Sequence, residues 1–232
     1  MKTIGLIGGM SWESTAVYYQ LLNRYVQQAL GGLHSAQLVM WSFDFAEIEE
    51  LQACGDWQTA AGRMIAAARR IKKGGAECVV LCTNTMHKLA DEVQNAVDIP
   101  LIHIVDATAK AIAETSAEKP LLLATRYTME QGFYKGRLSA RHDIDVCVPG
   151  EEDRQVVHDI IYNELCRGVI SDASKQKYLA IVQRARADGA DSAIFGCTEV
   201  GLLLSQRDFD IPIFNSTAIH ARAAVEFALD GT

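Results

Sequence analysis

Two short stretches of this 232-residue sequence place a thiol, hydroxyls and polar groups directly after an apolar run. They read CTNTMH at 82–87 and FGCTE at 195–199. A cysteine such as Cys197, at the end of a buried strand and before a helix start, lies where backbone N–H groups and the helix dipole favour a thiolate. Such positions can bring a thiol pKa from about 8.5 into roughly the 3.5–7.5 range. The pattern predicts acid/base or nucleophilic chemistry, and a cysteine that only packs is the alternative.

The first stretch also offers groups that could hold a substrate. Thr83, Asn84 and Thr85 are residue types that favour a helix start, and they can also hold a carboxylate against free backbone N–H groups. One interpretation does not exclude the other. His87, one turn further on, is either an orienting group behind the site or a surface histidine.

Three further segments could reach a ligand. GLIGGMS at 5–11 departs from GxGxxG and lacks an acidic residue about 20 positions on, so it favours close backbone approach to a ligand over dinucleotide binding. ATRYT at 124–128 offers two hydroxyls and a cation. Gln52 lies near the end of an acidic helical segment, from which it could reach a cleft.

Composition limits the class of protein. The chain is 49% hydrophobic with a net charge of −7 and has no basic cluster, so it predicts a globular core and argues against nucleic-acid binding. No apolar run approaches the roughly 18–20 residues of a membrane span, and the N-terminal apolar segment is too short for a signal peptide. We therefore expect a cytoplasmic protein without a membrane partner.

The six cysteines show no framework spacing and are expected to be thiols. Cys78, Cys82 and His87 lack a second ligand pair, so packing in a strand is favoured over metal binding. We expect no bound metal.

Strand-length apolar runs alternate with amphipathic helical segments, which predicts α/β architecture with parallel sheets covered by helices. Helical stripes are predicted within 61–71 and 178–185. Strands are predicted at 3–7, 37–43, 78–81, 101–104, 121–124, 144–147, 193–195 and 212–214.

The chain also repeats itself. GAECVVLCT at 75–83 aligns with GADSAIFGC at 189–197, which places Thr83 and Cys197 at equivalent positions 114 residues apart. Asp-Ile-Pro at 98–100 recurs at 210–212, and the strand after Lys2 matches the strand after Lys119. Three matches in one order predict two similar lobes, 1–98 with 208–232 and 99–207. Because ligands bind beyond the carboxyl ends of parallel strands, facing lobes would bring residues 83–85 and 197–199 to one cleft.

The whole chain resembles the cofactor-independent aspartate/glutamate racemase family. The resemblance lies in GLIGGMSWEST at 5–15, CTNTMH at 82–87, ATRYTM at 124–129 and FGCTE at 195–199. It implies two α/β lobes related by a pseudo-twofold axis, with the active site between them, a C-terminal helix that returns to the first lobe, and a homodimer. It also implies racemisation of a small-molecule amino acid by two acid/base groups, without pyridoxal phosphate or another cofactor.

The register of the resemblance agrees with the internal repeat. Aligned on Asn84 and Thr85, the family's first catalytic cysteine falls on Thr83, whereas Cys82 lies one residue earlier. A one-residue shift on a strand turns a side chain to the opposite face, so Cys82 is expected to face the core. The resemblance thus implies Thr83 and Cys197 as the acid/base pair, with Cys197 as the base for the L enantiomer.

The same resemblance implies a set of substrate contacts. Family members with acidic substrates also use a basic side chain for the distal carboxylate of the substrate. Arg126 is a candidate for this role, but Asn163-Glu164 stands where a lysine would be expected. Whether the substrate is acidic therefore stays open. The implied contacts are Met10, Gln52, Thr83, Asn84, Thr85 and Thr125, with Thr198 and Glu199 beside the thiol.

Three other functions compete with a racemase. A cysteine hydrolase would use Cys197 as nucleophile with His87 or His220 as base. A single-thiol decarboxylase or cis–trans isomerase of small diacids would not exchange amino-acid α-protons. A non-catalytic amino-acid-binding protein would bind without exchange.

Overall fold

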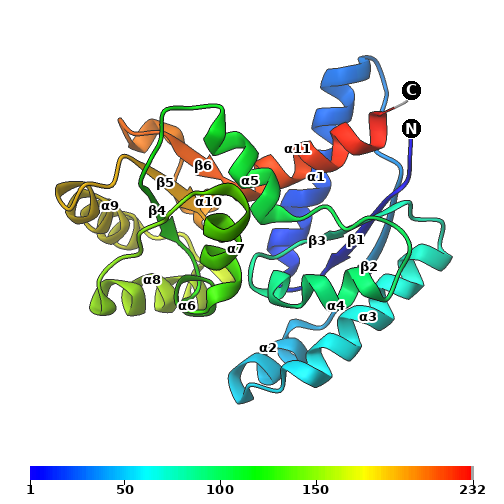
Figure 1. Cartoon of the computed structure of the whole chain (residues 1–232), viewed down its shortest axis with the longest axis horizontal. Coiled ribbons are helices and arrows are strands. Elements are labelled where there is room, and N and C mark those ends of the chain that lie inside the picture. Colours follow the sequence, from blue (N-terminus) through cyan, green and yellow to red (C-terminus); the bar gives the residue numbers. More distant parts are fainter. Residues whose placement is uncertain (231–232) are drawn as a thin grey trace. The chain divides into compact units, whose positions relative to one another are not determined.

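The computed structural model describes residues 1–230 and divides the chain into two compact units (Figure 1). Unit 1 consists of Met1–His103 together with the C-terminal stretch from His220, and unit 2 is Ile104–Ile219. Each unit contains a three-stranded parallel sheet with helices packed against it, as the strand–helix alternation predicts. The predicted α/β class is confirmed.

The sheet of unit 1 has the order β2-β1-β3, and residue Leu101 adds an isolated parallel bridge to Val79 beyond β3. Its strands are β1 (Ile4–Gly8), β2 (Leu38–Ser42) and β3 (Cys78–Leu81). Its helices are α1 (Trp12–Leu30), α2 (Phe45–Cys54), α3 (Trp57–Lys73), the 3-10 helix η1 (Thr85–Leu89), α4 (Ala90–Asn95) and the larger part of α11 (Ser216–Leu229).

Side-chain alternation along these strands builds two apolar layers, one on each face of the sheet. Ile7, Val79 and Leu81 pack in one cluster with α3 and α4. Residues one position away in sequence, among them Ile4, Leu6, Cys78, Val80 and Cys82, pack in the other cluster with Tyr18 and Leu22 of α1 and Ala221 and Ala224 of α11. Both faces are covered, as all-parallel sheets require.

The sheet of unit 2 has the order β4-β5-β6, and Cys147 adds an isolated parallel bridge to Leu121 beyond β4. Its strands are β4 (Pro120–Leu123), β5 (Ser192–Phe195) and β6 (Ile213–Asn215). Its helices are α5 (Ile104–Ala113), α6 (Arg126–Glu130), α7 (Gly132–His142), α8 (Glu151–Asn163), α9 (Asp172–Ala187) and α10 (Val200–Leu203), with the 3-10 helices η2 (Leu165–Arg167) and η3 (Gln206–Asp208).

The sequence predicts the six strands to within about a residue, but two of the eight predicted segments form only single bridges. The segment 101–104 contributes one bridge at Leu101 because α5 already begins at Ile104. The segment 144–147 contributes one bridge at Cys147. Four-residue apolar runs do not distinguish a full strand from a bridging segment.

The domain boundaries predicted near 98 and 207 differ from those of the compact units. β6 pairs in parallel with β5, from Ala193 with Ile213 to Phe195 with Asn215, so it belongs to the second sheet. Unit 2 therefore extends to Ile219, and the chain returns to unit 1 within α11 rather than before β6. The sequence places the break in the loop before β6, whereas backbone pairing with β5 holds that strand in unit 2.

Candidate active site

The end of β3 presents Thr83, and the end of β5 presents Cys197, at the same position of the backbone ladder. The Cys82 N–H donates to the Ile7 carbonyl on the neighbouring strand at 2.9 Å, and the Gly196 N–H donates to the Leu123 carbonyl at 2.8 Å. Each of these bonds is the last rung of its ladder. Thr83 and Cys197 are therefore the first residues beyond equivalent strand ends, as the repeat predicts.

Gly196 has a steric role at this position. A Cβ added to it would lie 2.7 Å from Leu122 Cδ1 and 3.0 Å from the Ala124 Cβ, closer than real Cβ atoms normally approach. Its counterpart Cys82 instead carries a side chain into the α1 side of the first sheet. The backbone register is thus the same in the two units, but the residue before the candidate acid/base position differs. Unit 2 requires a glycine there, Gly196, whereas unit 1 has room for the Cys82 side chain.

Cys82 lies in the core, as the one-residue shift predicts. Its exposed fraction is 0%, and it packs in the cluster that contains Tyr18, Val80 and Ala221. Burial raises the pKa of its thiol far above the usual range. Thr83 is half-buried. At this strand end Thr83 is therefore partly accessible to solvent, whereas the neighbouring Cys82 is not.

Cys197 contacts a buried carboxylate two residues further on. Its Sγ donates to Glu199 Oε2 at 2.9 Å, and the Cys166 Sγ donates to the other carboxylate oxygen, Oε1, at 3.7 Å. Glu199 is only 4% exposed and Cys197 8%. Cys166 comes from η2, and no sequence motif connects residue 166 with residue 197, so this contact is not predictable from the sequence. One carboxylate thus accepts hydrogen bonds from two thiols.

These surroundings correct the expected acidity of the thiol. Burial, followed by the charge of Glu199 and the proximity of Cys166, raises the pKa of Cys197 well above its usual range. The expected lowering by a helix start is wrong because α10 is only four residues long and the thiol is shielded from solvent beside a carboxylate. Cys197 is therefore a thiol that donates a hydrogen bond to Glu199.

Glu199→Gln is expected to accelerate alkylation of Cys197 at pH 7–8. A neutral amide removes the negative charge that disfavours the thiolate, so the pKa of Cys197 falls and the reactive fraction at a fixed pH rises. Iodoacetamide labelling resolved by peptide mass spectrometry measures this for Cys197 separately from the exposed Cys54. Glu114→Gln, an exposed site in the same unit, is the matched control and should change nothing. Slower labelling of Cys197 would contradict the assignment.

His87 holds the backbone at Thr83. Its Nδ1 lies 2.8 Å from the Thr83 carbonyl oxygen, so Nδ1 must carry the proton and donate, since a carbonyl only accepts. The ring is 3% exposed and meets His103 and His220 edge-on, at centroid distances of 4.8 and 5.4 Å. Of the two interpretations left open by the sequence, a surface histidine is therefore wrong, because the ring is buried and bonded to the backbone of Thr83.

His220 belongs to the same buried histidine group. Its Nε2 donates to the Ile102 carbonyl at 2.7 Å, and its Nδ1 lies 2.8 Å from the Tyr18 hydroxyl, which then donates. Burial lowers the pKa of His220 to about 4. Both ring nitrogens are occupied within unit 1, which leaves neither available as a base for a thiol nucleophile.

The remaining predicted residues of unit 1 lie at the carboxyl edge of its sheet. Met10 follows β1 and Gln52 lies in α2, which follows β2; both are buried. Gln52 Nε2 is 3.1 Å from the Met86 sulfur. Asn84 and Thr85 are buried at the start of η1, and Asn84 makes no side-chain cap there, so the helix-capping interpretation is not observed for it.

The predicted residues of unit 2 lie after β4 and β5. Thr125 caps α6, accepting from the Thr128 N–H, and its hydroxyl is 3.2 Å from that of Thr128. Thr198 Oγ1 is 2.8 Å from Thr217 Oγ1. Arg126 is exposed and its guanidinium contacts Gln155 at 3.4 Å. Because β4 and β5 are adjacent, Thr125 and Cys197 follow neighbouring strands of one sheet.

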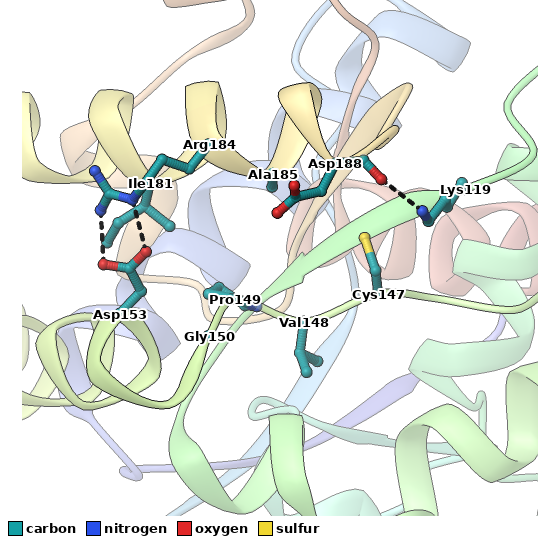
Figure 2. A pocket seen from close by; sticks show the side chains of 10 residues that line it. All are labelled: Lys119, Cys147, Val148, Pro149, Gly150, Asp153, Ile181, Arg184, Ala185 and Asp188. Atoms are coloured by element: carbon teal, nitrogen blue, oxygen red, sulfur yellow. Dashed lines mark hydrogen bonds and ion pairs between the residues drawn. The ribbon is translucent and has the colours of Figure 1, made fainter.

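Two hollows lie away from these strand ends. One in unit 2, of about 270 Å³, lies between the end of α9 and the segment 147–150; the Arg184 guanidinium there is paired with Asp153, and Lys119 Nζ bonds the Asp188 carbonyl (Figure 2). One in unit 1, of about 300 Å³, lies along Trp41–Asp44, with Arg70 stacked 4.3 Å over Trp41. Neither contains Thr83 or Cys197.

Metal sites and membrane-spanning helices are both absent from residues 1–230, the part of the chain that the structure describes. Among them, no group of three or more histidine, cysteine or carboxylate side chains is arranged to hold a metal ion. Within the same residues, no helix has both the length and the apolar character required to cross a bilayer.

Two α/β units with a hydroxyl and a thiol at equivalent strand ends define a duplicated fold. Residues 7–224 match the sequence family described as Asp/Glu/Hydantoin racemase. The chain belongs to this family, and the predicted racemase relationship is confirmed.

Individual relatives of this family are similar to the chain over nearly its whole length. A crystal structure from Yersinia pestis, provisionally assigned as an Asp/Glu racemase, is 53% identical and has a TM-score of 0.91, with 99% of this chain and 100% of that chain covered. An aspartate racemase homologue from Pyrococcus horikoshii is 32% identical with a TM-score of 0.85, covering 98% and 99%. The broad specificity amino-acid racemase RacX of Bacillus subtilis is 24% identical over 232 residues, covering 96% of both chains.

Proposed function

We propose that the chain racemises amino acids without pyridoxal phosphate, by proton transfer between the α-carbon and two groups, Cys197 on the L face and Thr83 on the opposite face. The observation that carries this proposal is the equivalent register of Thr83 and Cys197 at two strand ends. The family and the relatives named above support racemisation in general.

The L-face step begins with the Cys197 proton. Glu199 accepts the S–H hydrogen bond at 2.9 Å, so it is positioned to take that proton and leave a thiolate when substrate binds. The thiolate then removes the α-proton, which leaves a thiol and a carbanion. Backbone N–H groups at the strand ends would stabilise the carbanion charge in a site shielded from water.

The opposite face is served by a weaker acid. Thr83 can donate its hydroxyl proton to the carbanion, which gives the D enantiomer and leaves an alkoxide that must regain a proton at once. His87 would keep this hydroxyl in place through the Thr83 carbonyl. One strong and one weak acid/base group predict that proton removal on the L face is easier than completed inversion.

The test is α-proton exchange in D₂O across a panel of L- and D-amino acids that includes aspartate, glutamate and a neutral homologue. We expect exchange of at least one L-amino acid together with slower loss of optical activity. Binding without exchange would instead indicate a non-catalytic amino-acid-binding protein. An acyl-enzyme burst with an ester would indicate a hydrolase, for which the occupied nitrogens of His220 offer no base. Turnover of small diacids alone would indicate a decarboxylase or isomerase.

The panel also addresses specificity. Arg126 is the cation that follows β4, and its guanidinium is exposed and bonded to Gln155. If acidic substrates are preferred, Arg126→Gln is the variant that separates a role in binding the distal carboxylate from a surface position.

A further inference from the structure

Glu13 carries a carboxylate oxygen that is buried without a partner. Its Oε2 is shielded from solvent and accepts no hydrogen bond among residues 1–230. A buried acceptor without a donor costs free energy, and a charged one costs more, so such a group in a native protein calls for an explanation. A ligand that brings its own donor would supply one.

Glu13 lies in a helical turn that packs near Thr83. Glu13 lies in the first turn of α1, which begins where β1 ends. The next residue, Ser14, donates its hydroxyl to the Cys82 carbonyl at 3.1 Å, and Cys82 directly precedes Thr83. This turn therefore packs against the end of β3.

The direction of α1 also favours a position of the Glu13 side chain at the carboxyl edge of the sheet of unit 1, where β3 ends. Side chains on a helix lean toward its N-terminus, and the N-terminus of α1 is at the carboxyl edge of the sheet. Other carboxylates near this edge are engaged: Asp44 accepts from the Ala46 N–H, and Glu47 pairs with Arg63 at 3.7 Å. Glu13 is the carboxylate there with an unsatisfied buried oxygen.

We infer that Glu13 binds the protonated α-amino group of the substrate. The inference rests on the proposed function, because it requires an α-carbon next to Thr83. In an amino acid the ammonium is one bond from that carbon, so its binding site must lie within a few bond lengths of the proton-transfer groups. An ammonium provides three donors and a positive charge, which match an unsatisfied carboxylate oxygen. Contact with a carboxylate also keeps the amino group protonated, and the positive charge helps stabilise the carbanion.

A structural role for Glu13 makes a different prediction. An acidic residue in the first turn stabilises a helix through its dipole, and its loss would weaken all ligands alike. The experiment therefore compares each amino acid with the 2-hydroxy acid of the same side chain, L-aspartate with L-malate and L-alanine with L-lactate. The hydroxy acids keep the carboxylate and the side chain but lack the ammonium.

For Glu13→Gln we expect the dissociation constant of the amino acid to rise about 10- to 100-fold, the range for losing a hydrogen bond to a charged group, with little change for the hydroxy acid. Glu13→Asp, which keeps the charge, should recover part of the affinity. Glu226→Gln, an exposed site in the same unit with the same change of charge, should affect neither. Thermal unfolding checks that each variant is folded.

The outcomes separate this inference from the proposed function. If wild-type protein exchanges α-protons but Glu13→Gln binds both ligands as wild type does, or loses both equally, the role of Glu13 is refuted and the racemase proposal stands. If the wild-type protein exchanges no α-proton in the panel, the racemase proposal fails and the ammonium site fails with it.

Discussion

Cys197→Ala is expected to abolish both α-proton exchange and racemisation of the L-amino acid, with a loss of at least about 10²–10⁴-fold, the contribution of a positioned acid/base group. Without this sulfur, the thiol that remains next to Glu199 is that of Cys166, which comes from η2 and not from the end of β5. Loss of the α-proton NMR signal in D₂O measures the exchange step, and loss of optical activity measures the complete racemisation.

Folding and chemistry can be separated in this variant. Cys197 is small and 8% exposed, so removing its sulfur should lower the free energy of unfolding only by an amount ordinary for a point mutation, roughly 0.5–3 kcal/mol. The variant should still bind the substrate, as titration calorimetry can show. Exchange at the wild-type rate by a folded Cys197→Ala protein would remove the thiol from the mechanism.

The wild-type protein is expected to exchange the α-proton of an L-amino acid faster than it inverts the carbon, and Thr83→Cys is expected to close that gap. A thiol at position 83 is a much better proton donor than a hydroxyl, so we expect the ratio of inversion to exchange to rise about tenfold or more, within the range that acid/base groups contribute. Thr83→Ala should retain exchange on the L face and lose inversion. The comparison uses the two readouts on one sample.

Cys82→Ala is the matched control for position 83. Its sulfur is fully buried one residue away, so the variant should keep both rates while losing some stability. Equal exchange and inversion rates in the wild type would contradict the asymmetry. Loss of activity in Cys82→Ala with retention in Thr83→Ala would overturn the register. Because the racemisation equilibrium constant is one, kcat/KM must be equal in both directions, so the asymmetry concerns exchange against inversion and not the direction of reaction.

The two rates also test the role of His87. Its ring donates to the carbonyl of Thr83, in the unit that provides the weaker acid. A loss of that hydrogen bond displaces the hydroxyl without touching Cys197 or Glu199. If His87→Ala lowers inversion more than L-face exchange, the histidine acts through Thr83; equal losses would indicate a general loss of structure.

The register of the two strand ends is predictable from the sequence because it depends only on residues adjacent along the chain. The repeat of GAECVVLCT as GADSAIFGC fixes which residue follows each strand, and alternation along a strand places Cys82 on the core side. The β-ladder bonds of Cys82 and Gly196 show the same register. The boundary near 207 was less accessible, since whether β6 joins the second sheet depends on pairing with β5 rather than on its own residues.

By itself the sequence determined the α/β class, the duplicated strand ends, and the fact that Thr83 and Cys197 are the residues that follow those ends. These features depend on periodicity and on residues adjacent along the chain. Only the tertiary structure decided the surroundings of each group. Cys166, 31 residues before Cys197 along the chain, shares the Glu199 carboxylate with that thiol. The His87 ring bonds the Thr83 carbonyl, and one oxygen of Glu13 is buried in the first turn of α1. Proton affinity depends on burial and on neighbouring charges in space, so the pKa of Cys197 moves opposite to the direction its local motif predicts.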